Sequence, residues 1–478
     1  MGATPAEWSV NVMSYFLGGG VSGRRNRGVG PIRVYEMVIG GVSVMGFLIV
    51  NSSSIWASIG IIAVGAGIIG FFRVRSFLRG LSVGRTPQHW RILEWAGLDR
   101  HERGDKPGLF RQCDIAEHRT EGGVDIALMT HISRSGATVT GVLEQRGRTV
   151  GFVPQSTEEA AATMLNSWLV RMAAPTSGVT RVDFITQIYP AVQTREPYGP
   201  VEAELASIAS MMGVDHRHFM AVTMNPGTAT VDEFDGGTGD QDLFAAVCVL
   251  DDVARVSSSH GLTVTGVVST DKIGTFLQSF YVPSVYPVDP DAGEGWAGIP
   301  SYESTEIGVE SQVGDTTWLC SVAVIQADGW PPNPVEVNWL DPLTSGIPGV
   351  PFMTVIVSHV FVAHRTAVNH ATGQSALAQS KVYGAQMKGV VLDGIEQQRA
   401  DAANWALNDL KKSSAGDTPV LRVLVYAATE TELLECRRKV EDVLLTNMNI
   451  EDVSWCDNDH ARQLAACTPF GMGIGRLT

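Results

Sequence analysis

Paired cysteines are missing from this chain of 478 residues. Its six cysteines are scattered, none forms a Cys-x-x-Cys pair, and none has a histidine at zinc-finger spacing. Because structural zinc sites depend on such spacing, we predict no zinc site, and scattered thiols are typical of a reducing compartment. Free, buried cysteines are therefore expected at Cys113, Cys248, Cys320, Cys436, Cys456 and Cys467.

A P-loop is missing as well. This nucleotide-binding loop needs a lysine directly after a glycine, so that backbone amides and an ammonium group hold the phosphates together. None of the seven lysines follows a glycine. A glycine-rich segment at Gly471, Gly473 and Gly475 precedes only three further residues, so no helix is expected there to supply amide dipoles. The sequence therefore predicts no Walker A site and no nucleotide binding in this segment.

Catalytic motifs are missing too, since the chain contains neither Gly-x-Ser-x-Gly nor His-Glu-x-x-His. Histidines on one strand face could bind a metal, but no acidic or thiol partner stands at motif spacing. Ordinary core or surface histidines are the better interpretation, and a membrane-bound, metal-dependent enzyme is a weaker alternative. The residues concerned are His216 and His218, and the group His359, His364 and His370.

An acidic segment at Asp232, Glu233 and Asp235 lies beside two glycines. It lacks the ligand order of a calcium-binding loop, so a solvated turn is the better interpretation. Taken with the missing motifs, this leaves no residue set that favours catalysis. We expect a protein that is not an enzyme, with no catalytic residue, no cofactor and no metal site.

Net charge is distributed unevenly along the chain. Residues 1–112 hold 13 basic and 6 acidic residues, a net charge of +7, which leaves −22 for the rest of a chain whose total is −15. An acidic body argues against direct nucleic-acid binding, because neutralising phosphates needs a basic surface. The basic N-terminal region, in contrast, predicts contact with anionic lipid headgroups.

Two apolar runs, 34–50 and 55–72, are each about long enough to cross a bilayer. Four polar residues separate them, and arginines flank the pair on both outer sides. The positive-inside rule then predicts a multi-pass protein of the inner (cytoplasmic) membrane with both termini in the cytoplasm. The alternative interpretation is a buried helical hairpin of a soluble domain.

The remaining sequence alternates between strand-like and helix-like segments, and no tandem repeat is evident. Strands are expected at 149–154, 181–190, 217–224, 262–268, 316–327, 351–363, 420–428 and 450–455. Helices are expected at 156–171, 199–213, 239–259, 365–384, 389–411, 429–447 and 458–466, with capping boxes opening those at Ser156 and Thr429.

This pattern predicts an α+β fold class, in which an N-terminal two-helix transmembrane hairpin precedes cytoplasmic mixed α/β domains. Residues 73–112 are read either as a basic juxtamembrane linker or as an amphipathic core helix. The predicted divisions are a basic tail (1–30), the hairpin (31–72), the linker (73–112), an α/β domain (113–285), a Pro- and Trp-rich connection (286–350) and an α+β domain (351–478).

Several stretches of the last third resemble a known family. They are 359–370, 398–409, 420–455 and 463–474, the last containing Thr468-Pro469-Phe470-Gly471. The chain is similar to actinobacterial membrane proteins associated with type IV secretion and conjugation. Its N-terminal part resembles the small two-helix PrgI-type subunit, and its C-terminal part resembles the N-terminal, non-ATPase domain of conjugation ATPases. In those ATPases the closing motif leads into the nucleotide-binding domain, whereas only residues 472–478 follow it here.

This resemblance implies a non-catalytic, membrane-anchored structural subunit of a conjugative, type IV secretion-like apparatus. It would dock a separately encoded hexameric-type ATPase, contact other membrane subunits and form a homo-oligomer. The main alternative is a component of a type VII-like secretion complex, which differs in its ATPase partner.

Overall fold

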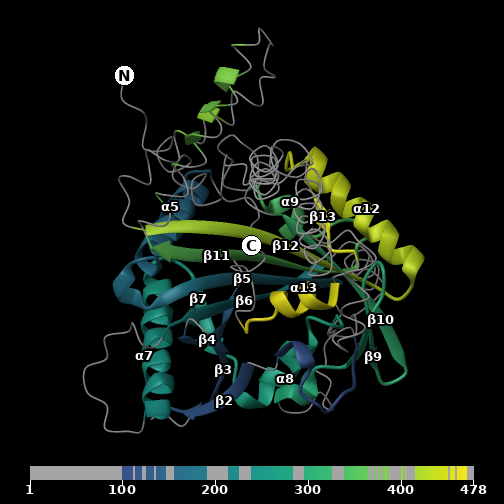
Figure 1. Cartoon of the computed structure of the whole chain (residues 1–478), viewed down its shortest axis with the longest axis horizontal. Helices are drawn as coiled ribbons and strands as arrows, with labels where there is room; N and C mark the ends of the chain where they lie inside the picture. Colours follow the sequence, from purple (N-terminus) through teal and green to yellow (C-terminus); the bar gives the residue numbers. More distant parts are fainter. Residues whose placement is uncertain are drawn as a thin grey trace, which may run out of the picture.

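The computed structural model describes one large β-sheet with helices on both faces (Figure 1). The described residues are 100–110, 113–120, 125–133, 136–146, 155–190, 214–225, 238–283, 295–325, 339–363, 415–450, 453–457 and 460–470, with scattered positions between 368 and 404. Within them, 13 strands form a single sheet in which every strand pair is antiparallel.

The N-terminal half of the sheet is built from consecutive elements. They are β2 (Cys113–Arg119), β3 (Asp125–Ser133), β4 (Gly136–Arg146), α5 (Gln155–Met172), β5 (Val179–Pro190), β6 (Val214–Met224), α7 (Thr238–Ser259), β7 (Thr263–Val267) and α8 (Thr270–Gln278). A short 3-10 turn, η2 (Pro175–Ser177), precedes β5.

The C-terminal half follows the same plan. Its elements are β8 (Ser301–Ser304), β9 (Val309–Val313), β10 (Thr316–Ile325), α9 (Asp341–Thr344), β11 (Phe352–Ala363), β12 (Ala415–Ala427), α12 (Glu430–Thr446), β13 (Ser454–Trp455) and α13 (His460–Cys467). The short β1 (Arg100–His101) pairs with β8, and the 3-10 turns η1 (Gly108–Phe110) and η4 (Gly295–Gly298) lie outside both units.

The two halves repeat one topology about the centre of the sheet. The strand order is β1-β8-β9-β10-β12-β11-β5-β6-β4-β3-β2. Outward from the central pair, β5, β6, β4, β3 and β2 correspond in turn to β11, β12, β10, β9 and β8. The off-path strands also correspond, because β7 pairs with β4 and β13 pairs with β10. Two equivalent sets of β-strands and helices therefore meet edge to edge.

Register and hydrogen bonds support the repeat in detail. The hairpin β3–β4 pairs Ser133 with Gly136, and the hairpin β9–β10 pairs Val313 with Thr316, so both close across two residues. The backbone N–H just after β7 donates to Val142 at 2.9 Å, and the N–H just after β13 donates to Val322 at 3.0 Å. Superposing the two registers places the pseudo-twofold axis at the cross-strand pair Ile185–Ile356.

Each face of the sheet has its own core, because side chains alternate between the two faces of a strand. One face is covered by α8 and α13, and both halves contribute to a single apolar cluster there that includes Ile185 and Ile356. We call it the α8/α13 face. On the opposite α7/α12 face the core is divided: α5 and α7 cover the N-terminal half, and α9 and α12 cover the C-terminal half.

Local sequence explains the central strands and α12. β11 and β12 are rich in valine and other β-formers, and most of their described side chains are buried on both faces. α12 begins with a capping box, in which the Glu432 N–H donates to Thr429 Oγ1 at 3.3 Å and the Thr429 N–H donates to the Glu432 carboxylate at 3.2 Å.

Close backbone packing requires glycine where η4 meets α8. A Cβ added at Gly298 would lie 2.1 Å from the carbonyl oxygen of Gly274. The approach of these two backbones is therefore possible only without a side chain at Gly298.

The predicted fold class is wrong. The sequence indicated a transmembrane hairpin followed by separate mixed α/β domains, whereas the described residues form one antiparallel sheet with few helices. The alternation of strands and helices along the chain was read correctly in outline, but it does not specify which strands pair. Contacts between distant segments decide that, and here they join 179–190 to 352–363 in one sheet.

The predicted multi-pass membrane location is also corrected. No helix among residues 100–470, so far as the structure describes them, is long and apolar enough to cross a bilayer. The predicted hairpin at 31–72, the tail before it and most of the linker at 73–112 lie outside the described residues. The domain boundaries remain predictions.

Individual elements were predicted better than their assembly. The helices at 156–171, 239–259, 429–447 and 458–466 are confirmed as α5, α7, α12 and α13, and the expected strands from 181 onward are also present. The strands between 113 and 146, β8, β9 and the helix α8 were missed. Predicted elements at 149–154 and 199–213, and most of 365–411, lie outside the described residues.

Candidate functional site

Charged residues are buried at the centre of the α8/α13 face, next to the pseudo-twofold axis. On β5, Arg181 Nε donates to Asp183 Oδ1 at 2.7 Å, and the two residues are only 4% and 1% exposed. They stand two positions apart on the strand, so both side chains lie on the same face as Ile185. Burying such a salt bridge costs free energy, and removing one of its partners is strongly destabilising.

A second arginine joins this pair from the other half. Arg422 of β12 is 1% exposed, and its Nη1 donates to Ser358 Oγ at 3.2 Å. Ser358 is the cross-strand neighbour of Asp183. Burial lowers the pKa of Arg422, and Arg181 lowers it further, whereas Asp183 acts in the opposite direction. We call Arg181, Asp183, Ser358 and Arg422 the charged cluster; it holds two cations and one anion.

Hydrogen bonding within the charged cluster is incomplete. Nη1 and Nη2 of Arg181 and Nε of Arg422 have no hydrogen-bond acceptor within the part of the chain that the structure describes. Buried donors without an acceptor are unfavourable. Asp183 is therefore the principal group that offsets the two positive charges of Arg181 and Arg422. The charged cluster is therefore a sensitive point of stability.

Cys467 of α13 lies close enough to the charged cluster to interact with it electrostatically. Burial raises the pKa of this thiol to about 12, although Arg422 and Arg181 each act to lower it. Because the thiolate is the nucleophile and metal ligand, Cys467 is an inert thiol at neutral pH. Burial likewise raises the pKa of Cys113 to about 12.

The equivalent place on the other side of the axis is polar but uncharged. Gln187 Nε2 donates to Ser279 Oγ at 2.6 Å, and Ser279 Oγ donates to the carbonyl of Phe276 at 2.6 Å. Tyr426 Oη lies 3.3 Å from Thr354 Oγ1. We call Gln187, Ser279, Thr354 and Tyr426 the neutral cluster. A hollow beside it has a volume of about 10 Å³, enough for about one water molecule.

A buried histidine anchors α13. The backbone N–H of Val322 donates to His460 Nδ1 at 3.2 Å, so the proton is on Nε2, which lies 3.3 Å from Asp457 Oδ1. Arg437 of α12 contacts the same carboxylate at 2.9 Å. Burial alone would raise the pKa of Asp457, but hydrogen bonds with His460 and Arg437 lower it below its usual value. His460 therefore ties α13 to β10 and to α12.

The histidines considered from sequence have structural surroundings where they are described. His216 and His218 stack on β6 with ring centroids 5.9 Å apart. His216 Nε2 donates to the carbonyl of Thr344 at 2.8 Å, and His218 Nδ1 lies 3.2 Å from Thr186 Oγ1. Burial lowers the pKa of His218, and His216 lowers it further.

His359 is 3% exposed and packs edge-on against Phe184, and His364 and His370 lie outside the described residues. The acidic segment at 232–235 is also outside them. Among the residues that the structure describes, no group of three metal-binding side chains comes together. The six cysteines are all described and none forms a disulfide.

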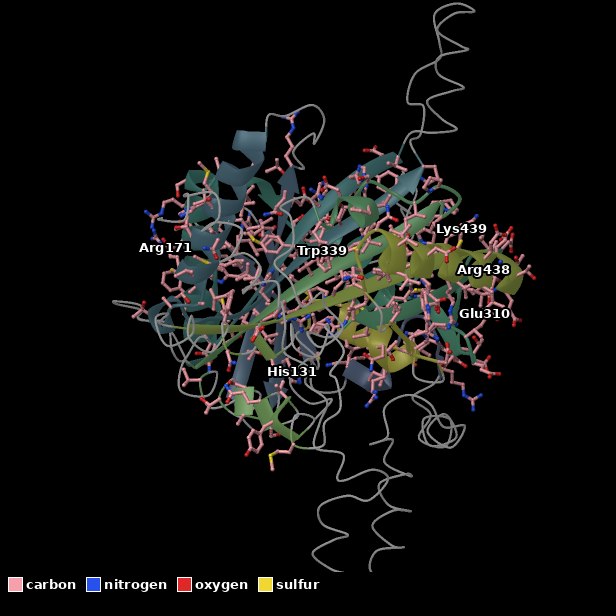
Figure 2. The ribbon with its side chains drawn as sticks, turned by 90° about the horizontal axis from the view of Figure 1, so that it is seen from above. His131, Arg171, Glu310, Trp339, Arg438 and Lys439 are labelled. Carbon is pink, nitrogen blue, oxygen red and sulfur yellow. The ribbon has the colours of Figure 1, made fainter. Side chains whose placement is uncertain are left out.

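The outer surface of α12 exposes two leucines. Leu434 and Leu445 are 42% and 55% exposed. Together with Glu430, Arg438 and Asp442 they recur every three or four residues, so they share one stripe of the helix. Figure 2 shows Arg438 and Lys439 on α12 at one margin of the molecule, with Arg171 of α5 near the opposite margin. We call Glu430, Leu434, Arg438, Asp442 and Leu445 the α12 stripe.

Sequence reasoning missed both the charged cluster and the α12 stripe. A signal for the first was present, because Arg181, Asp183 and Gln187 occupy alternate positions of an otherwise apolar strand. Arg422 likewise interrupts the apolar run of β12. Charges inside such apolar runs indicate buried ion pairs. The sequence does not show, however, that β5 and β12 lie in one sheet with only β11 between them.

Comparison with known proteins adds no relative. No known protein family matches this chain, and no curated protein matches it.

Proposed function

We propose that this chain is a non-catalytic, protein-binding subunit of a conjugative, type IV secretion-like apparatus, and that it works beside a separately encoded motor ATPase. The observation that carries the proposal is the joining of two equivalent units into one sheet. The β5–β11 strand pair and one shared apolar cluster hold the two units together, while α12 presents an exposed stripe with two leucines.

The resemblance to the non-ATPase domain of conjugation ATPases supports the choice of partner. The resembling stretches include 420–455 and 463–474, which contain α12 and β13 and parts of β12 and α13. The N-terminal unit repeats that topology without the same resemblance in sequence. A rigid pair of such units suits a platform on which an ATPase is positioned, because exposed apolar residues rimmed by charge are typical of docking surfaces.

Copurification tests this function. The tagged full chain would be expressed together with the hexamer-type ATPase encoded in the same genetic element. We expect the two proteins to elute as one complex in size-exclusion chromatography, and the ATPase alone to account for all nucleotide hydrolysis. The charge-altered variant Asp125→Asn, which changes a partly exposed residue of β3, serves as a matched control and should copurify normally.

Two results would reject the proposal. Binding of an FtsK-like protein with several ATPase domains, in place of the hexamer-type ATPase, would favour the type VII-like alternative. Absence of any complex with either ATPase, although all proteins are folded, would remove the docking function altogether.

A further inference from the structure

Positive charge exceeds negative charge in the charged cluster. Two guanidinium groups and one carboxylate leave it with a net charge of +1. Asp183 is the only carboxylate among the described residues whose charge raises the pKa of Arg422. Cys467 does not supply a second negative charge at neutral pH, because burial raises the pKa of its thiol to about 12. A buried charge without a counterion is unfavourable, so the charged cluster lacks one negative charge.

The two guanidinium groups converge on one cross-strand pair. Asp183 of β5 and Ser358 of β11 are direct neighbours. Arg181 Nε donates to Asp183 Oδ1 at 2.7 Å, and Arg422 Nη1 donates to Ser358 Oγ at 3.2 Å. Along the strands, Arg181 lies on one side of this pair and Arg422 lies on the other. One cation from each half of the sheet therefore reaches the same buried place.

The orphaned atoms of the charged cluster define the kind of ligand that fits. They are Nη1 and Nη2 of Arg181 and Nε of Arg422, for which the described part of the chain offers no acceptor. All three are donors, so a matching group has to accept hydrogen bonds. A water molecule would bring two donors of its own and would leave the excess charge in place. A small monovalent anion, in contrast, accepts from several donors and restores neutrality.

The repeat shows that the backbone itself does not require this excess of charge. Phe352 and Phe219 occupy the positions across the pseudo-twofold axis that correspond to Arg181 and Arg422. The neutral cluster on that side contains no charged residue. The two buried arginines are therefore particular to one side of the axis, and the other side provides an internal comparison.

From these observations we propose that the charged cluster binds one small inorganic anion, of the size and charge of chloride, between the guanidinium groups of Arg181 and Arg422. The ion accepts hydrogen bonds from the three orphaned donors and supplies the missing negative charge. Because one arginine belongs to each half of the sheet, the ion stabilises the joining of the two halves. This structural role does not depend on the proposed ATPase partner.

Urea denaturation of the full chain tests the site, with chloride as the probe. Mixtures of sodium chloride and sodium gluconate keep the ionic strength constant while chloride varies over about a hundredfold range. Once chloride exceeds its Kd, we expect the unfolding equilibrium constant of the wild type to fall by up to about tenfold for each tenfold rise in chloride, because the ion binds only the folded protein. Arg422→Met leaves Arg181 paired with Asp183 and should abolish this dependence.

Tyr426→Phe is the matched control, because it alters the buried neutral cluster without changing charge. It should keep the chloride dependence of the wild type, and general differences between the two salts should affect all three proteins alike. The inference would be overturned by a wild type whose stability ignores chloride, or by an equal chloride dependence in Arg422→Met.

A second measurement needs no variant and therefore decides the matter even if Arg422→Met fails to fold. Crystals of the wild type would be grown in sodium bromide, and diffraction data would be collected at the bromine absorption edge. We expect an anomalous peak within hydrogen-bonding distance of the guanidinium groups of Arg181 and Arg422. A peak there without anomalous signal would identify a water molecule, and bromide found only on the surface would be an adventitious ion only; either result rejects the site.

Discussion

The two sides of the pseudo-twofold axis place different chemistry at equivalent positions. On one side Arg181, Asp183 and Arg422 bury three charges; on the other, Thr354 and Gln187, the equivalents of Asp183 and Ser358, form neutral hydrogen bonds with Tyr426 and Ser279. Both clusters lie beside the Ile185–Ile356 pair and beneath α8 and α13. The same backbone framework therefore accommodates either a charged or a neutral cluster. The difference indicates that the alternation of apolar residues specifies the fold, whereas the buried polar residues vary between the two halves.

The outer helices differ in the same way. α5, with 18 residues, packs on the sheet beside α7, whereas α9, the described helix beside α12, has only 4 residues. Both halves nevertheless expose apolar residues on a helix, Met164 and Val170 on α5 and Leu434 and Leu445 on α12. Variants in both halves test how far their equivalence extends.

Asp183→Asn is expected to have the largest effect. The substitution removes the carboxylate that offsets two buried guanidinium groups, so we expect a loss of about 3–5 kcal/mol in the free energy of unfolding, measured by urea denaturation. Asp125→Asn is the control, because Asp125 is partly exposed and pairs at 3.6 Å with the exposed Arg119, so the change should alter stability by less than about 1 kcal/mol.

A second variant keeps this prediction testable if Asp183→Asn fails to fold. Adding Arg181→Met and Arg422→Met removes the uncompensated charges, and much of the lost stability should return. Similar small losses for Asp183→Asn and Asp125→Asn would show that the charged cluster does not differ energetically from a surface ion pair.

Tyr426→Phe is expected to have a moderate effect on the neutral side. The variant keeps the ring and removes a hydroxyl that lies 3.3 Å from Thr354 Oγ1 and from the carbonyl oxygens of Ser279 and Phe280. We expect a loss of about 1 kcal/mol in urea denaturation, the usual contribution of a hydrogen bond between neutral groups. A loss as large as that of Asp183→Asn would mean that the two clusters are energetically equivalent after all.

Asp457→Asn is expected to have the smallest effect and a distinct pH dependence. The pKa of Asp457 is lowered in the folded protein, so the stability it contributes is present above its ordinary value of 3.8 and is lost as the pH falls below 3.8 through the folded pKa. The wild type should exceed the variant by less than about 1 kcal/mol at neutral pH, since the carboxylate is partly exposed. Stability curves between pH 7 and pH 3 should show this difference shrinking only at the acid end.

The other half supplies the control for that measurement. Thr270 begins α8 as His460 begins α13, but its buried hydroxyl has no hydrogen-bond partner among the described residues. Thr270→Val should therefore leave the acid dependence of stability unchanged. A pH-dependent change in this variant would contradict the assignment of the acid effect to Asp457.

Sequence reasoning recovered the elements whose signals are local. The Thr429–Glu432 capping box and the amphipathic period predicted α12, and the valine-rich runs predicted β11 and β12. It missed β2, β3 and β4, whose polar and apolar residues are mixed because these strands lie toward one edge of the sheet. It also missed the charged cluster, since its charges come from β5 and β12, two strands far apart in the chain.

By itself, the sequence determined those strands and helices whose signals are local, such as α12, β11 and β12, because backbone propensity, capping and side-chain period act over a few residues. It also determined that the cysteines lack motif spacing and that no P-loop lysine is present. Only the tertiary structure decided that the two halves repeat one topology and meet at Ile185 and Ile356. It alone brought Arg422 to the Arg181–Asp183 pair and left the α12 stripe uncovered, because pairing and burial depend on contacts between residues far apart in the chain.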